Sequence, residues 1–268
     1  MRRGAVLICT VLLSVLFGLF GFADDMLERP AISITNDYEF TTENGVTSGQ
    51  GTSDDPYVIQ GWTIDAGYDD YGIRIHGTTR YFVIRDVEVS GAAKAAIYLS
   101  YVQNVTIEDC RFVANRAGVT MNFAAFNRVA RCLFSDHTDA IRLYFSHHNQ
   151  VISSRFEDND TALWFDASNE NEAIGNLIQD CHMGLYLNLG SQANRIVGNA
   201  FDNNIHNAYT ANPNTWDNGT SGNYWSGFEV LDTDANGIWE SPYVIRSEGD
   251  QDNFPLVCHP LVAPGCGE

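Results

Sequence analysis

The sequence predicts an all-β fold: a single-stranded, right-handed parallel β-helix (a solenoid) with coils of about 22 residues and a cap at each end. The first supporting observation is a short phrase that recurs at a fixed spacing: a small residue, then two apolar residues separated by one variable residue. Its copies are residues 96–99, 118–121, 140–143, 162–165 and 184–187. A fixed period of this size indicates a solenoid, in which each repeat packs against its neighbours.

The alternation inside each copy is the second observation. Apolar residues recur there at every second position, which is the period of a β-strand with one buried face. A 22-residue unit is also too short for a pair of helices with their turns. Each copy therefore predicts one strand, and strands of successive coils would lie about 4.8 Å apart.

Columns of small polar residues are the third observation. A second apolar strand follows each copy, and the same positions around it are polar in one coil after another. The columns are Asn104, Asn127, Asn149, Asn171 and Asn194; Cys110, Cys132, Ser154, Asn176 and Asn199; and Asn115, His137, Asn159, Cys181 and Asn204. Because stacked side-chain amides can hydrogen-bond along the axis, we expect polar ladders at these positions.

The chain divides into four predicted segments. Residues 1–23 read as a secretory signal peptide, because Arg2 and Arg3 precede an uncharged apolar run and a small-x-small sequence. An uncleaved membrane anchor is the alternative, since about 18 apolar residues could just span a bilayer. Residues 24–50 then form an N-terminal cap, residues 51–213 the β-helix and residues 214–268 a C-terminal cap. Either reading of the first segment predicts export to the periplasm, the cell surface or the medium.

The charge and the cysteines limit the partners and the compartment. The formal net charge is −19, and Lys94 is the only lysine. Such a surface disfavours nucleic acid and anionic membranes, and it favours cations, cationic partners or neutral sugars. The cysteines within the polar columns are expected to be small turn residues. Cys258 and Cys266 flank a proline-containing tail, where a disulfide is plausible after export.

Three segments outside the coils carry a resemblance to a known family. They are residues 51–59, which open Gly-Thr-Ser-Asp-Asp-Pro, residues 223–226, which read Asn-Tyr-Trp-Ser, and residues 252–256, which read Asp-Asn-Phe-Pro-Leu. With the coils, they resemble the NosD-like right-handed β-helix family over roughly residues 51–257. That family includes the periplasmic accessory protein of copper assembly in nitrous oxide reductase, and it overlaps the carbohydrate-binding and sugar-hydrolase β-helices. The resemblance implies the fold and an export route, whereas activity depends on the site.

One outward face of the predicted strands combines aromatic, charged and amide side chains. If the apolar residues of each phrase point inward, the residues between and after them point outward. The candidate saccharide-binding residues on this face are Arg142, Tyr144, Trp164, Asp166, Tyr186 and Asn188. Aromatic rings stack on the apolar faces of sugars, while arginine, aspartate and asparagine bind hydroxyls. The alternative is that aromatic residues and arginine simply favour exposed strand positions.

Catalysis on this face would need a second acidic group. Glycoside hydrolysis commonly uses two carboxyl groups about 5–10 Å apart, and Asp166 is the only carboxylate in the outward rows. Asp139 begins a neighbouring strand and could supply the partner only if the turn folds over the face. Asp166 is therefore the single catalytic candidate, and we expect binding without catalysis.

An acidic loop in the C-terminal cap has the spacing of a calcium loop. Its ligands would be the side chains of Asp232, Asp234, Asn236 and Glu240 and the carbonyl of Ile238. The twelfth position is Tyr243 instead of the usual glutamate. The carboxylates that could complete the shell are Asp217, Asp250 and Asp252. The alternative is an Asp/Asn-Gly turn that needs no metal; a calcium ion here would be structural.

Copper requires a cluster of histidine, cysteine or methionine ligands. His147 and His148 are adjacent in an expected turn, but the other histidines are scattered, so the residues themselves predict no copper site. Three functions stay open. They are recognition of a saccharide or cell-surface polymer without catalysis, an accessory role in maturing a periplasmic copper enzyme through transporter or copper-enzyme partners, and a polysaccharide lyase or hydrolase.

Overall fold

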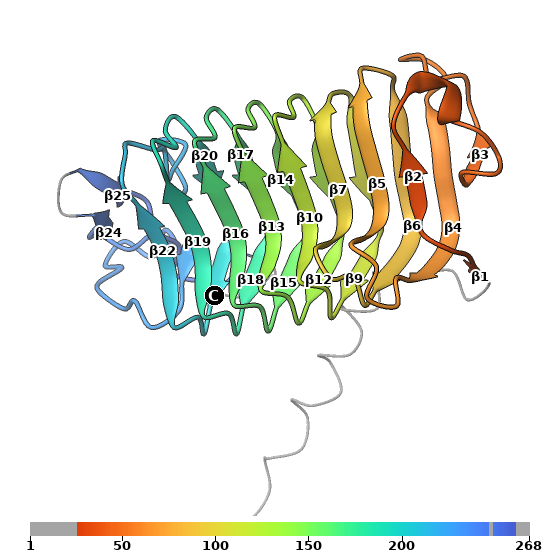
Figure 1. Ribbon diagram of the computed structural model, residues 1–268. Helices are drawn as coiled ribbons and strands as arrows, with labels where there is room; N and C mark the ends of the chain where they lie inside the picture. The colour runs from red at the N-terminus through yellow and green to blue at the C-terminus, as the bar shows by residue number, and fades with distance from the viewer. Residues whose placement is uncertain (1–25, 247–248, 261–268) are drawn as a thin grey trace, which may run out of the picture.

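The computed structural model describes residues 26–246 and 249–260, which form a right-handed parallel β-helix of about seven coils. The coils stack side by side along one axis, with the N-terminal strands at one end and β24 and β25 at the other (Figure 1). The all-β prediction is confirmed. The predicted signal peptide at residues 1–23 lies outside the described residues, and within the described residues no helix is long and apolar enough to cross a bilayer.

One wall of the β-helix is a separate parallel sheet, which we call the eight-stranded wall. In spatial order it consists of β2 (Ile32–Ile34), β5 (Tyr71–Thr78), β7 (Ala95–Val102), β10 (Ala117–Asn122), β13 (Asp139–Tyr144), β16 (Thr161–Asp166), β19 (Met183–Asn188) and β22 (His206–Thr210). All five copies of the repeated phrase lie in it. Since β2 pairs in parallel with β5, this wall begins within the segment predicted as the N-terminal cap.

The other two walls join into one larger sheet. The second wall contains β8 (Val105–Glu108), β11 (Arg128–Ala130), β14 (Gln150–Ile152), β17 (Glu172–Ile174) and β20 (Arg195–Val197). The third contains β9 (Arg111–Val113), β12 (Leu133–Ser135), β15 (Arg155–Glu157), β18 (Leu177–Gln179), β21 (Ala200–Asp202) and β23 (Tyr224–Trp225). The long strand β6 (Phe82–Ser90) pairs with both β8 and β9, which is why the two walls merge near the N-terminus.

The ends of the rod are built from shorter elements. At the N-terminal end, β1 (Leu27–Glu28) and β3 (Val46–Ser48) pair with β4 (Tyr57–Asp65), and a 3₁₀ turn spans Asp37–Glu39. At the other end, β24 (Tyr243–Arg246) and β25 (Asp250–Asp252) form an antiparallel pair. These elements cover the strand edges that the terminal coils would otherwise expose.

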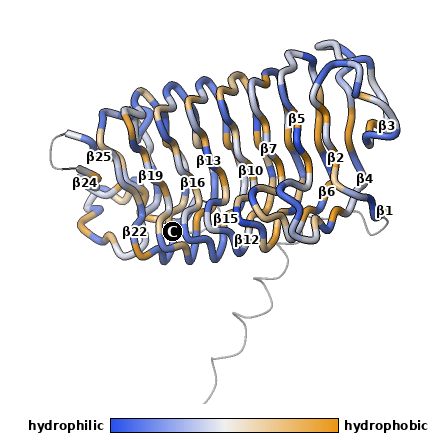
Figure 2. The backbone as a smooth tube through the Cα atoms, in the orientation of Figure 1, coloured by the Kyte–Doolittle hydropathy of each residue, from blue (hydrophilic) through white to orange (hydrophobic). Residues whose placement is uncertain are grey.

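The core repeats with the coil. Hydrophobic residues recur along the strands of the coils (Figure 2), and the apolar positions of the phrase are buried from Ile97 to Leu187. The small residue of the phrase is explained by Gly118: a Cβ there would come within 2.5 Å of the Phe134 ring and of the Ala140 carbonyl oxygen. An inner column stacks Phe134 on Phe156 at 4.9 Å. The predicted inward face of the eight-stranded wall is therefore confirmed.

Buried polar ladders run along the axis as the sequence predicts. Asn171 Nδ2 donates to Asn194 Oδ1 at 3.1 Å, and the Asn149 N–H donates to Asn171 Oδ1 at 2.8 Å. Asn104 does not belong to this ladder: it donates to the Thr79 carbonyl, and the ladder begins at Asn127. The prediction for Asn104 was wrong by one position, because the equivalent slot of its coil holds a valine.

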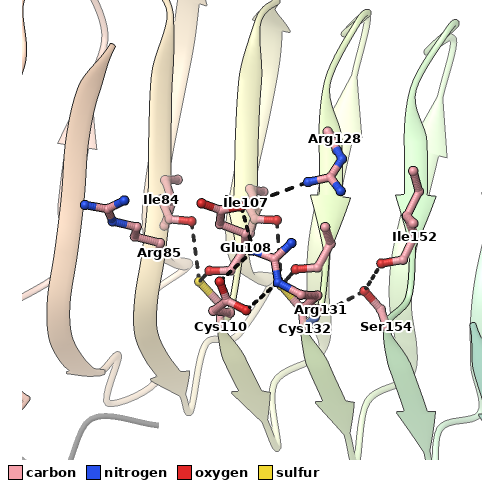
Figure 3. Close-up of polar contacts among 12 residues, drawn as sticks. Ile84, Arg85, Ile107, Glu108, Cys110, Arg128, Arg131, Cys132, Ile152 and Ser154 are labelled. Atoms are coloured by element: carbon pink, nitrogen blue, oxygen red, sulfur yellow. Dashed lines mark hydrogen bonds and ion pairs between the residues drawn. The ribbon is translucent and has the colours of Figure 1, made fainter. Parts of the chain in front are cut away.

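The column of Cys110, Cys132 and Ser154 forms a second ladder (Figure 3). The Cys132 N–H donates to Ser154 Oγ at 3.2 Å, and Cys110 Sγ lies 3.6 Å from the Ile84 carbonyl oxygen. Burial, with Cys132 as the next cause, raises the pKa of the Cys110 thiol well above its usual value. These cysteines are interior turn residues, as predicted, whereas the pairing of Cys258 with Cys266 stays a prediction because residues 261–268 lie outside the described residues.

The corners of each coil depend on a left-handed residue placed directly before a ladder residue. Phe126, Arg131 and Asp136 have φ values of 58°, 53° and 60° and precede Asn127, Cys132 and His137. This conformation costs an L-residue about 1–3 kcal/mol. The side chain of the ladder residue that follows hydrogen-bonds to the backbone of the preceding coil, so the sharp corner and the ladder support each other.

The family-like segments of the C-terminal cap close the last coil. The Trp225 ring stacks on Phe201 at 4.5 Å and donates its N–H to Asp252 at 2.9 Å, while Trp216 donates to Asp250 at 3.0 Å. Both indoles are buried. Asp250 and Asp252 therefore bind the tryptophans of the cap. The sequence analysis considered the same two carboxylates as ligands that could complete a calcium shell.

Candidate functional site

The six predicted saccharide-binding residues lie together on the eight-stranded wall. Arg142 of β13 pairs with Trp164 of β16, and Trp164 pairs with Tyr186 of β19. The neighbouring outward row is Tyr144, Asp166 and Asn188. Stacking of the coils thus brings side chains that are 22 residues apart in the sequence into direct contact.

Arg142 is the centre of these contacts. Its Cζ lies 4.5 Å from the centroid of the Trp164 ring, a cation–π distance. Its Nη2 donates to Oδ2 of Asp166 at 3.2 Å. The Trp164 ring meets Tyr186 edge-on, with centroids 5.4 Å apart. These contacts fix the orientation of the guanidinium and of both rings, so the surface is formed before any ligand arrives.

Asp139 lies on the same wall, at the start of β13. Its Oδ2 is 3.8 Å from Nη1 of Arg142, and the side chains of both Asp139 and Asp166 are largely buried. Burial raises the pKa of Asp139, and the positive charges of Arg142 and Arg116 oppose that rise. The Arg142 guanidinium therefore contacts two carboxyl groups, those of Asp139 and Asp166.

Four buried polar atoms of this wall have no hydrogen-bond partner within the described residues. They are Asn122 Oδ1, Asp139 Oδ1, Trp164 Nε1 and Asp166 Oδ1. A buried polar group without a partner costs about 1–3 kcal/mol, and native structures hold few of them. Three of the four atoms are oxygen acceptors, which complement hydroxyl donors.

A cavity of about 490 Å³ opens on the N-terminal side of Arg142. This volume falls in the range of about 300–1,000 Å³ that is usual for small-molecule sites. Its polar lining includes Tyr71, Lys94, Tyr98, Arg116, Asp139 and Arg142. The candidate site therefore extends further toward the N-terminus than the sequence predicted.

Lys94 and Arg116 are site residues that the sequence reasoning missed. They lie in the turn before the strand, and each stands two positions before the small residue of its phrase. They are 22 residues apart, like the residues of the wall itself. That spacing is the signal that could have identified them.

An exposed strip of aromatic rings borders the site. Phe123 stacks between Tyr101 and Phe145 with centroid distances of 5.1 and 5.2 Å, and all three rings are exposed. Tyr144 packs edge-on against Phe145 at 4.6 Å and connects the strip to the rows described above. The strip adds apolar surface beside the polar wall, at corner positions that also have positive φ values.

The acidic loop of the C-terminal cap turns its carboxylates toward its own backbone. Asp232 accepts from the N–H groups of Asn236 and Gly237 at 3.1 Å, and Glu240 accepts from the Thr233 N–H at 2.9 Å. Hydrogen bonds from Thr233 lower the pKa of Glu240. Within the described residues, no three His, Cys, Asp or Glu side chains form a group that could hold a metal. Calcium at Asp232, Asp234, Asn236, Ile238 and Glu240 stays a prediction.

His182 and His206 pack edge-on with their centroids 5.6 Å apart, whereas the other histidines make separate local contacts. His137 is a ladder residue whose pKa is lowered by burial. His147 accepts from the Asn169 N–H at 3.0 Å, whereas His148 stacks on Phe126 at 5.0 Å. These side chains offer no common set of copper ligands.

The stacked coils, the internal ladders and the site on one wall define a right-handed parallel β-helix protein. Residues 30–230 match the family described as periplasmic copper-binding protein (NosD), and the chain belongs to that family. A comparison with curated proteins gives no match.

Solved structures share the fold. A mutant of the periplasmic alginate epimerase AlgG has a TM-score of 0.54 at 21% identity, covering 60% of this chain and 44% of the epimerase chain. AlgG itself has a TM-score of 0.50 at 20% identity, with 58% and 46% covered. A Bacillus pectate lyase in complex with trigalacturonate has a TM-score of 0.44 at 14% identity, with 82% and 83% covered. The chain spans less than half the length of the epimerase chains that it matches.

Proposed function

We propose that this exported protein binds a saccharide polymer along the eight-stranded wall. The observation that carries the proposal is the row of Arg142, Trp164 and Tyr186 on the outer face, which continues into the cavity of about 490 Å³. Sugar hydroxyls would bind the polar side chains that line the cavity, while the apolar faces of sugar rings stack on the aromatic side chains. AlgG, which shares the fold, is an alginate epimerase by name, so the fold is compatible with a polymer ligand.

Trp164 provides the direct test. On a glycan array, the full chain should bind a saccharide, and Trp164→Ala should lower the affinity at least about tenfold, since a stacked aromatic ring contributes on the order of 1 kcal/mol beyond its buried area. Tyr38→Ala is the matched control, because Tyr38 is an exposed ring far along the chain in the N-terminal cap. Thermal unfolding of each variant establishes that it is folded. Equal binding by Trp164→Ala and the parent would remove the proposal.

A second candidate function is a polysaccharide-active enzyme. It is favoured by the two largely buried carboxyl groups of Asp139 and Asp166 on either side of Arg142. Burial raises the pKa of Asp139, which favours a proton donor, and Asp166 accepts a hydrogen bond from Arg142. Product formation from a polysaccharide that both Asp139→Asn and Asp166→Asn abolish would establish this function. If the parent binds the polysaccharide but forms no product, the function is recognition without catalysis.

An accessory role in copper-enzyme maturation is a third candidate, and the family description, periplasmic copper-binding protein, is the observation behind it. Because no three potential metal ligands form a group within the described residues, this role would act through partner proteins such as a membrane transporter or a copper enzyme. Co-purification of such a partner from the native periplasm would support it. We propose no copper-dependent step on the residues described.

A further inference from the structure

The cations of this wall differ from those elsewhere in the molecule. On the other walls, Arg111, Arg128, Arg131 and Arg195 pair with carboxylates of the preceding coil; Arg131, for example, binds Glu108 and Asp109 at 2.8 and 2.7 Å. Arg74 and Arg116, in contrast, form no side-chain hydrogen bond or ion pair within the described residues. Arg116 is exposed and lines the cavity, and Arg74 lies beside Tyr98 in the outward row.

Two further cations complete the cluster. Lys94 lines the cavity and pairs with Asp70 at 2.7 Å, but both side chains are more than half exposed. An exposed pair of this kind contributes little, so Lys94 can exchange partners at small cost. Arg142 is shared between Asp139 and Asp166.

The balance of charge is unusual for this molecule. Four cationic side chains (Arg74, Lys94, Arg116 and Arg142) stand on this part of the wall against four carboxyl groups (Asp70, Asp139, Asp160 and Asp166), so this cluster carries no excess negative charge in a chain whose net charge is −19. The cavity is thus a local exception to a surface that repels anions.

We infer that the cavity binds the carboxylate of an acidic saccharide, so that the polymer recognised by this wall is built from uronic acids. This inference rests on the function proposed above and specifies its ligand. The Arg116 guanidinium supplies a planar fork of donors that matches a carboxylate in two parallel hydrogen bonds. Arg74 and Lys94 receive the charge of neighbouring units, while Trp164 and Tyr186 stack on sugar rings farther along the axis.

The experiment compares the acid form and the methyl-ester form of one polysaccharide. Binding of the full chain to polygalacturonate and to its fully methyl-esterified form is measured by affinity electrophoresis and calorimetry. The acid form should bind at least about tenfold more tightly, because a hydrogen bond between two ionised groups is worth considerably more than a neutral one. Raising the salt concentration should weaken the acid form only.

Arg116→Gln is the decisive variant. It should lower the affinity for the acid form about tenfold and leave the ester unchanged. Arg128→Gln is the matched control, since it removes the same charge from β11 on the second wall. Because Arg116 is exposed and makes no side-chain contacts that the fold needs, the variant should unfold at the temperature of the parent.

The outcomes separate this inference from the proposed function. If both polymer forms bind equally and Trp164→Ala weakens both, saccharide binding stands and the preference for uronic acids is overturned. An acid preference that survives Arg116→Gln and Arg74→Gln also overturns it. If neither polygalacturonate nor alginate binds while a neutral saccharide does, the inference fails and the function stands. If the array shows no saccharide at all, both fail.

Discussion

The indole N–H of Trp225 donates to Asp252 at 2.9 Å, and neither side chain is exposed. Asp252 also accepts from the backbone N–H groups of Asn223 and Phe254 at 2.7 and 3.0 Å. Asp252→Asn should lower the free energy of unfolding by about 2–3 kcal/mol. The carboxylate only accepts hydrogen bonds, whereas the NH2 group of asparagine donates, so it would face one of these N–H groups. Urea unfolding measures the effect. Asp136→Asn, at an exposed position, is the control and should change little; equal stability of the two variants would contradict this role of Asp252.

The ladder predicts a contrast between inward and outward asparagines. Asn171 donates to the Ser146 carbonyl and to Asn194, and it accepts from Asn149, all in the interior. Asn171→Ala leaves several buried groups without partners and should cost about 2–4 kcal/mol. Asn188→Ala removes an amide from the outer face and should cost less than about 0.5 kcal/mol. Similar losses in thermal unfolding would mean that the ladder contributes no special stability.

At the glycines, a steric clash of an added Cβ should cost more stability than a positive φ. Gly118 has an ordinary φ, but a Cβ there meets the Phe134 ring at 2.5 Å. Gly67 has a φ of 55°, yet nothing lies within 4 Å of its Cβ position. Gly118→Ala should therefore destabilise by about 2–4 kcal/mol and Gly67→Ala by only about 1 kcal/mol. The reverse order, measured by chemical unfolding, would refute the steric explanation for the small residue of the phrase.

The buried carboxyl of Asp139 predicts a particular pH dependence. Its pKa is raised by burial, so the native state keeps a proton that the unfolded chain has released between the ordinary carboxyl pKa of about 4 and the raised value. Stability contributed by this group is present at low pH and is lost as the pH rises through that window. The free energy of unfolding of Asp139→Asn relative to the parent should therefore increase with pH across the window. A difference that is constant or falls with pH would show that the Arg142 contact dominates instead.

The acidic loop predicts a response to calcium. Asp232, Asp234 and Asn236 have the spacing of calcium ligands, and their side-chain oxygens already face the loop backbone. A chelator should lower the melting temperature of the parent, added calcium should restore it, and Asp232→Ala should abolish the response. If no chelator changes the melting temperature of the parent, this segment is a turn that needs no metal.

The repeat made the walls and their register predictable. Because successive coils superpose, the spacing of Leu163 and Leu185 fixed both the buried face and the outward pairing of Trp164 with Tyr186. The ladders followed from the same spacing. Asn104 was misplaced because it lies 23 residues before Asn127, whereas Val105, 22 residues before Asn127, holds the equivalent slot.

The corners explain why part of the site was not predicted. Their left-handed positions hold Phe126, Arg131 and Asp136 where glycine would have signalled the conformation. The 22-residue spacing places Lys94 and Arg116 in one column, but without the corner geometry it does not show that they line the cavity or that Asp139 reaches Arg142. Likewise, the bonds of Asp250 and Asp252 to two tryptophans join segments more than 25 residues apart by contacts that no periodicity encodes.

The internal ladders also determine how such a molecule can change its length. Each ladder residue meets an equivalent neighbour before and after it, so a duplicated coil inserted between β16 and β19 would find matching partners on both sides. The two caps would remain untouched. Tandem duplication would then lengthen the rod in steps of about 4.8 Å and add one row to the outer face each time. A single duplication could therefore extend the length of polymer that the outer face contacts.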